Sequence, residues 1–264
     1  MTQLDRRALY DQAAVRYDRA RPAYPKALFD DILSFAQLDE NARILEVGCG
    51  SGQATLSLAR RGWQIDCIEL SARLAELARG KLARFPHVRI ISGDYDEMPL
   101  PAAAYDLLVA ATAFHWLDPA TRFHKAHSAL KPGGCIALFW HRPASSQLSR
   151  DCMATLQGAY REHAPALAAK WQTPPPPDQM PDEFSAPITE SGCFQPAHVK
   201  RYAYNLSYSA AAYIDLLGTF SDHLALPPAT RKNLLAEIKR LINEACGGCA
   251  IREQVTTLYL ACRL

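Results

Sequence analysis

The sequence predicts an α/β fold in which a mostly parallel sheet of seven strands carries helices on both of its faces. Two observations lead to this prediction. Strand and helix signals alternate through the first 140 residues, as they do when crossover helices connect parallel strands. A glycine-rich turn also joins the first strand of that series directly to the helix that follows it.

The first half of the chain supplies five strands and the helices between them. Apolar runs predict strands at residues 42–47, 64–70, 88–92, 105–111 and 135–140, and helical periodicity predicts helices at residues 52–61, 71–84 and 118–130. Ser71 can cap the second of these helices with its hydroxyl. The sequence KPGG at residues 131–134 is expected to stop the third, because proline cannot continue a helix.

Beyond residue 141 the alternation changes. Residues 145–171 have a helical pattern, and four consecutive prolines at 174–177 then favour an extended or turning backbone, so we expect a helical lid insertion after the fifth strand. Residues 198–206 and 253–262 are typical of two more strands, and residues 210–220 and 228–245 of helices.

Composition excludes several classes of partner. The chain of 264 residues has 49% hydrophobic and 21% charged residues and a formal net charge of +2, so no strong field favours nucleic acid or a membrane surface. The first residues, MTQLDRRALYDQ, lack the apolar segment of a secretory signal, and no apolar run approaches the length of about 18 residues that a membrane span needs. We therefore expect a cytoplasmic protein that acts on a small molecule.

Eight cysteines are spread thinly along the chain, several of them inside apolar runs. A free thiol packs there as a small hydrophobic group, so no disulfide framework is indicated. Cys246 and Cys249 have the spacing of a redox or metal pair, but no second pair of cysteines accompanies them. A zinc site needs about four ligands, and we predict no metal.

The most informative segment is LEVGCGSG at residues 45–52, a strand that enters a glycine turn and then a helix. Gly48, Gly50 and Gly52 are spaced as GxGxG, whereas the dinucleotide fingerprint is GxGxxG and would place its third glycine where this chain has Gln53. Glycines let a ligand approach the backbone, and the N-terminus of the helix offers N–H groups to a carboxylate or phosphate.

Acidic residues lie at or near the ends of three predicted strands, namely Glu46, Glu69 and Asp94. In open α/β sheets ligands bind at the carboxyl ends of the strands. Glu69 follows Gly48 by 21 residues, about the separation at which a carboxylate accepts hydrogen bonds from ribose hydroxyls. Asp94 is placed to accept one from the exocyclic amine of adenine, so an adenosine-type ligand is implied.

The segments LEVGCGSG, CIELS, SGDYDEMPLP, AYDLLVAATAFHWLD and LKPGG together resemble the class I S-adenosylmethionine-dependent methyltransferases and their Rossmann-like fold. The resemblance covers residues 40–140. The segments YDRARPAYP at 17–25 and AFHWLD at 113–118 are also similar to small-molecule enzymes of the trans-aconitate methyltransferase-like kind. The motif of Asp or Asn followed by Pro-Pro-Tyr, found in nucleic-acid amino-methyltransferases, is absent after the fourth predicted strand, which disfavours base methylation.

The resemblance implies S-adenosylmethionine as the cofactor, with S-adenosylhomocysteine as its product. The three glycines would pass under the methionine part, Glu46 would hold its amino group, Glu69 would bind the ribose, and Asp94 with the Tyr95 backbone would recognise adenine. One domain is expected, with an N-terminal helical lid segment (1–40), a cofactor-binding core (41–141), the lid insertion (142–195) and a C-terminal part that completes the sheet (196–264).

The acceptor side of the site is expected to combine cationic, aromatic and hydroxyl groups. Candidates for catalysis are Tyr17, Arg21 and His115, and candidates for substrate binding are Tyr24, Trp116 and Arg142. Methyl transfer mainly requires that the acceptor be held at a near-attack distance and shielded from water. A carboxylate is already ionised at pH 7 and needs no general base, so Arg21 would act as its clamp.

The leading hypothesis is therefore O-methylation of a small carboxylate. One alternative is a hydroxyl or amine acceptor with His115 as the base. Another is a protein that binds S-adenosylmethionine without turnover. A nicotinamide-dependent dehydrogenase is disfavoured by the GxGxG spacing.

Overall fold

A computed structural model describes residue 18, residues 22–145 and residues 147–264, except for the side chains of 147 and 148. The chain divides into two compact units. The first, here the sheet unit, comprises Pro22–His141, Pro181–Tyr202 and Thr256–Leu264. The second, here the helical unit, comprises Arg142–Met180 and Ala203–Val255 among the described residues.

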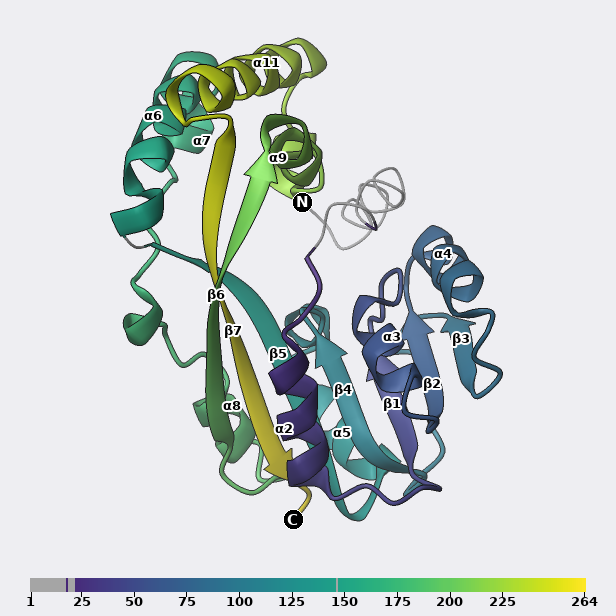
Figure 1. Cartoon of the computed structure of the whole chain (residues 1–264). Helices are drawn as coiled ribbons and strands as arrows, with labels where there is room; N and C mark the ends of the chain where they lie inside the picture. The colour runs from purple at the N-terminus through teal and green to yellow at the C-terminus, as the bar shows by residue number, and fades with distance from the viewer. Residues whose placement is uncertain (1–17, 19–21, 146) are drawn as a thin grey trace. The chain divides into compact units, whose positions relative to one another are not determined.

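Seven strands form a single sheet in the order β3-β2-β1-β4-β5-β7-β6 (Figure 1). They are β1 (Arg43–Val47), β2 (Gln64–Glu69), β3 (Val88–Ser92), β4 (Tyr105–Ala111), β5 (Leu130–Ala144), β6 (His198–Ser209) and β7 (Cys249–Cys262). The pairs β1 with β2, β2 with β3, β1 with β4 and β4 with β5 are all parallel. The chain leaves β1 toward β2 and β3 and then returns to the other side of β1 with β4, so the strand order reverses between β1 and β4. A ligand crevice is expected at such a switch point.

The described α-helices connect these strands or follow them. They are α2 (Lys26–Ala36), α3 (Gln53–Ala59), α4 (Ala72–Leu82), α5 (Arg122–Ala129), α6 (Gln147–His163), α7 (Pro165–Ala168), α8 (Ser185–Glu190), α9 (Ala210–Leu217), α10 (Ser221–Leu224) and α11 (Pro228–Ala245). Ser71 caps α4 as predicted, because its hydroxyl accepts a hydrogen bond from the Leu74 N–H at 3.1 Å.

In the sheet unit, helices cover both faces of the parallel strands, as predicted. Ile44 of β1 and Val109 of β4 belong to a buried cluster with residues of α2, α3 and α4. Leu45 of β1 and Leu108 of β4 point to the opposite face and pack with residues of α5 and α8. Both faces are buried, which explains why these strands are continuous apolar runs rather than alternating ones.

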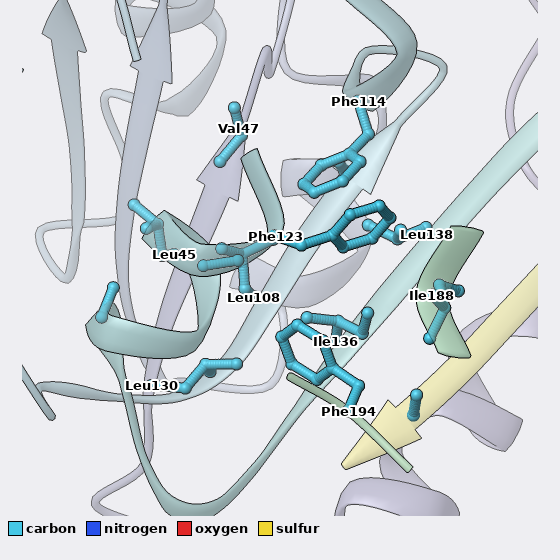
Figure 2. Packing of buried hydrophobic residues seen from close by; sticks show 14 of the residues in the cluster. Leu45, Val47, Leu108, Phe114, Phe123, Leu130, Ile136, Leu138, Ile188 and Phe194 are labelled. Carbon is cyan, nitrogen blue, oxygen red and sulfur yellow. The ribbon is translucent and has the colours of Figure 1, made fainter. Parts of the chain in front are cut away.

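Figure 2 shows part of the second cluster. Phe123 of α5 lies between Phe114, which follows β4, and strand residues such as Leu138 of β5. The rings of Phe114 and Phe123 have their centroids 5.1 Å apart. This packing fixes the segment after β4, which carries several of the candidate site residues, against the sheet.

Two boundaries near β5 differ from the prediction. The predicted helix at 118–130 is shorter, because Asp118 accepts hydrogen bonds from the Ala120 N–H and the Thr121 hydroxyl in a turn before α5 begins. The KPGG sequence lies within β5, as a bulge between Leu130 and Cys135. A Cβ on Gly134 would lie 3.0 Å from the Lys131 carbonyl oxygen, so the bulge requires glycine at that position.

The helical unit departs further from the prediction. The helix expected at 145–171 is divided at Ala164 into α6 and α7, because Pro165 has no N–H to continue the ladder and instead begins the next helix. Its core joins α6, α9 and α11 through buried residues that include Leu156, Leu217 and Ile238. Strands β6 and β7 are longer than predicted, and both contribute residues to the two units.

The expectation that the cysteines are unpaired was wrong for four of them. Cys135 of β5 is bonded to Cys262 of β7, and Cys152 of α6 is bonded to Cys246, which follows α11. The partners are 127 and 94 residues apart in sequence, so no local spacing could indicate them. Cys246 therefore pairs with Cys152 and not with Cys249.

Within the part of the chain that the structure describes, no helix is both long enough and apolar enough to cross a membrane. The same residues contain no group of three or more His, Cys, Asp or Glu side chains that could hold a metal ion.

Candidate functional site

The turn after β1 is shaped by glycines that other residues could not replace. Gly48 has φ +68°, and a Cβ at this position would lie only 2.4 Å from the Cβ of Ala113. Gly52 has φ +84° and is the N-cap of α3. The Gly48 N–H donates to the Ile68 carbonyl at 2.8 Å, which ties the turn to β2. The glycine turn thus lies against the segment after β4, at the point where the strand order reverses.

Glu46 is a buried carboxyl for which the described residues provide no cation. Its exposed fraction is 0%, and neither carboxyl oxygen has a hydrogen-bond partner of normal geometry among the described residues. Burial raises the pKa of Glu46 to about 7, against an opposing effect of the Thr55 hydroxyl and with a further contribution from the Glu69 carboxylate. Burying a carboxyl in this way is energetically unfavourable. A ligand that brings a positive charge or N–H donors to it relieves that cost and therefore binds more tightly.

Glu69 ends β2 and is nearly buried as well, but both of its oxygens accept backbone hydrogen bonds. Oε2 accepts from the Gly50 N–H at 2.8 Å, and Oε1 accepts from the Ser71 N–H at 2.9 Å. The sequence indicated Glu69 as a ligand for ribose but not as a support of the glycine turn. Each carboxylate oxygen has a second lone pair, so Glu69 can hold the turn and still accept a hydroxyl.

The register of the sheet brings these residues to one edge. Glu69 of β2 is the neighbour of Ser92 of β3, and Glu46 of β1 is the neighbour of Val109 of β4. The carboxyl ends of four parallel strands therefore meet at this edge, as the strand-end argument predicted.

Asp94 and Tyr95 follow β3 at this edge. Asp94 Oδ1 accepts a hydrogen bond from the Asp96 N–H at 2.9 Å, which closes a tight turn. The Tyr95 ring is buried under the Lys125 ammonium, whose Nζ lies 5.1 Å from the ring centroid. Burial raises the pKa of Tyr95, so the phenol stays neutral.

The segment after β4 carries the aromatic candidates. Thr112 has φ +56°, and a short 3₁₀ turn at Phe114–Trp116 follows it. Phe114 points into the core, whereas His115 and Trp116 are exposed, the latter by 40%. The Trp140 indole N–H donates to His115 Nδ1 at 2.9 Å, a contact that the sequence did not indicate.

Tyr24 lies beside the ends of β4 and β5. Its hydroxyl is 3.0 Å from Thr112 Oγ1, and its ring stacks on His141, with centroids 4.0 Å apart and planes 7° apart. His141 Nδ1 is in turn 2.9 Å from Thr256 Oγ1 on β7. Sequence reasoning identified Tyr24 but missed His141 as its partner, because the two residues are far apart in the chain.

Three of the predicted site residues are not among the described residues of the sheet unit. Tyr17 and Arg21 lie outside the described residues. Arg142 is half-buried and belongs to the helical unit, so it is described with that unit. The sheet unit itself gathers Glu46, the glycine turn, Glu69, Asp94, Tyr95, Tyr24, His115 and Trp116.

Comparison with known proteins agrees with this geometry. Residues 45–138 match the protein family described as methyltransferase domain. An uncharacterised methyltransferase of Mycobacterium tuberculosis is 30% identical over 132 residues, which are 50% of this chain and 51% of that protein. The malonyl-[acyl-carrier protein] O-methyltransferase of Geobacter sulfurreducens is 35% identical over 142 residues, which are 51% of this chain and 53% of that protein. The chain thus spans about half the length of these curated relatives.

Solved structures share the fold. A candidate type II methyltransferase from Anaeromyxobacter dehalogenans is 25% identical, with a TM-score of 0.61 over 92% of this chain and 96% of that chain. Phosphoethanolamine N-methyltransferase 2 of Haemonchus contortus, solved with phosphomonomethylethanolamine and S-adenosylhomocysteine, is 14% identical, with a TM-score of 0.55 over 98% of this chain and 58% of that chain. At that identity the second likeness concerns the fold alone.

Proposed function

We propose that this chain is a class I S-adenosylmethionine-dependent methyltransferase and that it methylates a carboxylate oxygen of a small molecule. The observation that supports the cofactor site most directly is Glu46, a fully buried carboxyl beside a glycine turn, to which the described residues bring no cation. The closer resemblance to trans-aconitate methyltransferase-like enzymes stays a prediction.

The residues present fit S-adenosylmethionine. Glu46 would pair with the ammonium of the methionine part. Glu69 would accept hydrogen bonds from the ribose hydroxyls, and Asp94 with the Tyr95 backbone would bind adenine. The spacing GxGxG and the edge of the sheet at which these groups meet support this assignment over a dinucleotide.

The bound cofactor supplies an electrophilic methyl group on a sulfonium. The remaining task of the protein is to hold an acceptor oxygen in line with that group and to exclude water. A carboxylate, with a reference pKa near 4, is already nucleophilic at pH 7, so the exposed His115 and Trp116 need only position it. O-methylation in the name of the malonyl-[acyl-carrier protein] relative supports a carboxylate over other acceptors.

The cofactor half of the proposal is tested by isothermal titration with S-adenosylmethionine, S-adenosylhomocysteine and NAD. We expect micromolar binding of the first two, lost in Glu69→Ala and retained in Glu76→Ala, which removes an exposed carboxylate from α4. Binding of NAD alone would refute the assignment of the cofactor.

The acceptor half is tested with cofactor that carries a labelled methyl group and a panel of small carboxylic acids, each paired with the corresponding amine and the corresponding alcohol. We expect label in a base-labile methyl ester of at least one acid. Label only in an alcohol or amine would favour the hydroxyl or amine alternative. Binding of the cofactor without transfer to any member of the panel would favour a non-catalytic binding protein.

A further inference from the structure

One hydrogen bond of His115 bears directly on which of its ring nitrogens carries a proton. The donor is the indole Nε1–H of Trp140 on β5, and the acceptor is Nδ1 of His115, at a distance of 2.9 Å. The indole is itself fixed. Trp140 is 3% exposed, and its ring stacks on Phe184 with centroids 4.0 Å apart and planes 16° apart, while Tyr259 contacts it edge-on at 5.9 Å. Trp140 therefore presents its N–H in one direction.

An indole nitrogen donates hydrogen bonds and never accepts them. His115 Nδ1 must then carry a lone pair, and a neutral imidazole has its single proton on the other nitrogen, Nε2. For His115 to act as a general base at Nε2, that atom would need the lone pair that this bond assigns to Nδ1. The bond from Trp140 thus selects the tautomer in which Nε2 of His115 is an N–H donor.

We propose that His115 Nε2–H is the group that binds the anionic oxygen of the methyl acceptor, and that Trp140 is the positioning residue that holds His115 in the donor tautomer. This inference rests on the proposed function and sharpens it, because it selects between the two roles open to His115. A carboxylate offers oxygens that accept from Nε2–H. A hydroxyl or amine acceptor that must lose a proton would find no base in this histidine.

The place of His115 in the fold agrees with that role. Ala113, two residues before it, fills the space that a side chain on Gly48 would occupy, so His115 lies in a turn that contacts the glycine turn. The adjacent Trp116 is exposed, and its ring centroid is 4.6 Å from that of His115. The Trp116 ring thus places an apolar surface beside the proposed donor. Such a surface suits the hydrocarbon part of a small organic acid.

The tautomer is measured directly by two-bond ¹⁵N–¹H correlation NMR of the histidine side chains, with His115→Gln used to assign the signals of His115. We expect a protonated Nε2 and an unprotonated Nδ1 in the wild-type protein. In Trp140→Phe, which keeps an aromatic ring against Phe184 but removes the donor, we expect the two tautomers to mix. The control is Trp63→Phe, which removes a different indole donor, to the Asp39 carbonyl, and should leave the signals of His115 unchanged.

A proton on Nδ1 in the wild-type protein would overturn the inference, and so would an unchanged tautomer in Trp140→Phe in which the fold is intact by circular dichroism. Neither outcome depends on turnover. If no carboxylic acid is methylated but the tautomer is as expected, the proposed function fails while the assignment of Trp140 stands.

Kinetics with an acid from the panel separate binding from base catalysis. Glutamine places an N–H donor near the position of Nε2, whereas methionine places none, so His115→Met should raise the KM of the acceptor about 10- to 100-fold and His115→Gln by much less. In both variants kcat should change little. An equal loss of kcat in both variants, with KM unchanged, would identify His115 as a base and contradict the proposal.

Discussion

Two buried polar groups, one in each unit of this protein, differ in how far their hydrogen bonds are satisfied. In the helical unit, the buried His223 is satisfied on both ring nitrogens, by Asp222 Oδ1 at 2.7 Å and by the Tyr160 hydroxyl at 2.7 Å. In the sheet unit, the carboxyl of Glu46 is more deeply buried and has no hydrogen-bond partner of normal geometry among the described residues. A satisfied network stabilises the fold that contains it, whereas an unmatched buried charge is a cost that a ligand can relieve. The comparison supports the proposal that the cofactor site lies in the sheet unit.

Among the substitutions that test this comparison, the largest change in stability is expected in the helical unit. The Cys152–Cys246 disulfide restrains a segment of 94 residues in the unfolded chain, so Cys152→Ala should lower the free energy of unfolding by about 4 kcal/mol. Urea denaturation without reductant measures this loss. Cys249→Ala, which removes an unbonded thiol of the same unit, is the control and should lose much less. Equal losses in the two variants would show that the disulfide contributes nothing.

The next largest effect is a pH dependence of the free energy of unfolding, which arises from Glu46 in the sheet unit. Its pKa is raised from 4.5 to about 7, so the native state retains a proton that the unfolded state releases between those values. The free energy of unfolding of the cofactor-free protein should therefore fall by about 3 kcal/mol as pH rises from about 4.5 to 7, and this contribution should be constant above that range.

Glu46→Gln removes that titration. Relative to the wild-type protein, the variant should gain about 3 kcal/mol at pH 8 and nothing near pH 4, as measured by urea denaturation across the pH range. Glu76→Gln, at an exposed position, is the matched control and should leave the pH profile unchanged. If Glu46→Gln has the same pH profile of stability as the wild-type protein, the raised pKa of the buried Glu46 carboxyl would be contradicted.

A smaller difference separates two glycines with nearly the same backbone conformation. Gly48 in the sheet unit has φ +68°, and Gly247 in the helical unit has φ +65°. Alanine at either position incurs the cost of a left-handed backbone, about 1 kcal/mol. Only Gly48→Ala adds a clash, at 2.4 Å from Ala113, whereas a Cβ at Gly247 meets nothing within 4 Å.

Gly48→Ala should therefore lose about 2 kcal/mol more stability than Gly247→Ala. It should also weaken binding of S-adenosylmethionine by at least about 100-fold, since the shifted turn can no longer admit the ligand. Thermal unfolding and titration calorimetry measure the two effects. If the two variants bind S-adenosylmethionine with equal affinity, the glycine turn is not part of the cofactor site.

The smallest effect compares two helix caps. The Ser71 hydroxyl accepts from the Leu74 N–H at 3.1 Å in the sheet unit, and the Ser209 hydroxyl accepts from the Ala212 N–H at 3.3 Å in the helical unit. Replacement by alanine should cost about 1 kcal/mol at each site, and more at Ser71 because it is buried. A larger loss at Ser209, measured by denaturation, would contradict the reasoning from burial.

Prediction from sequence also succeeded to different degrees in the two units. Strands β1 to β4 were located to within one residue at each end, because parallel strands buried on both faces are short apolar runs bounded by turns. The break of the predicted helix at Pro165 was missed although the proline was visible, because the periodicity on both sides of it suggested one continuous helix. The two disulfides could not be predicted, since their partners meet only through the tertiary fold.

The candidate site, like the fold, could be predicted from the sequence only in part. Glycine spacing and acidic strand ends are local signals, and the register of the sheet brings them together at one edge. The contact of Ala113 with Gly48, the stack of Tyr24 on His141 and the bond from Trp140 to His115 all join distant segments. Each of these contacts changes the interpretation of a residue that the sequence had already identified, because position in the chain does not show what a side chain will touch.

The central claim is that the cofactor brings a positive charge to the buried Glu46 carboxyl, and proton release on binding tests it most directly. At pH 6.5 Glu46 is mostly protonated, while an α-amino group with a reference pKa of about 7.7–8.0 is already charged. Titration of S-adenosylmethionine in buffers of different ionisation enthalpy should therefore show release of more than about half a proton by the wild-type protein and of none by Glu46→Gln. Binding without proton release in the wild-type protein, or with equal release in the variant, would contradict the claim.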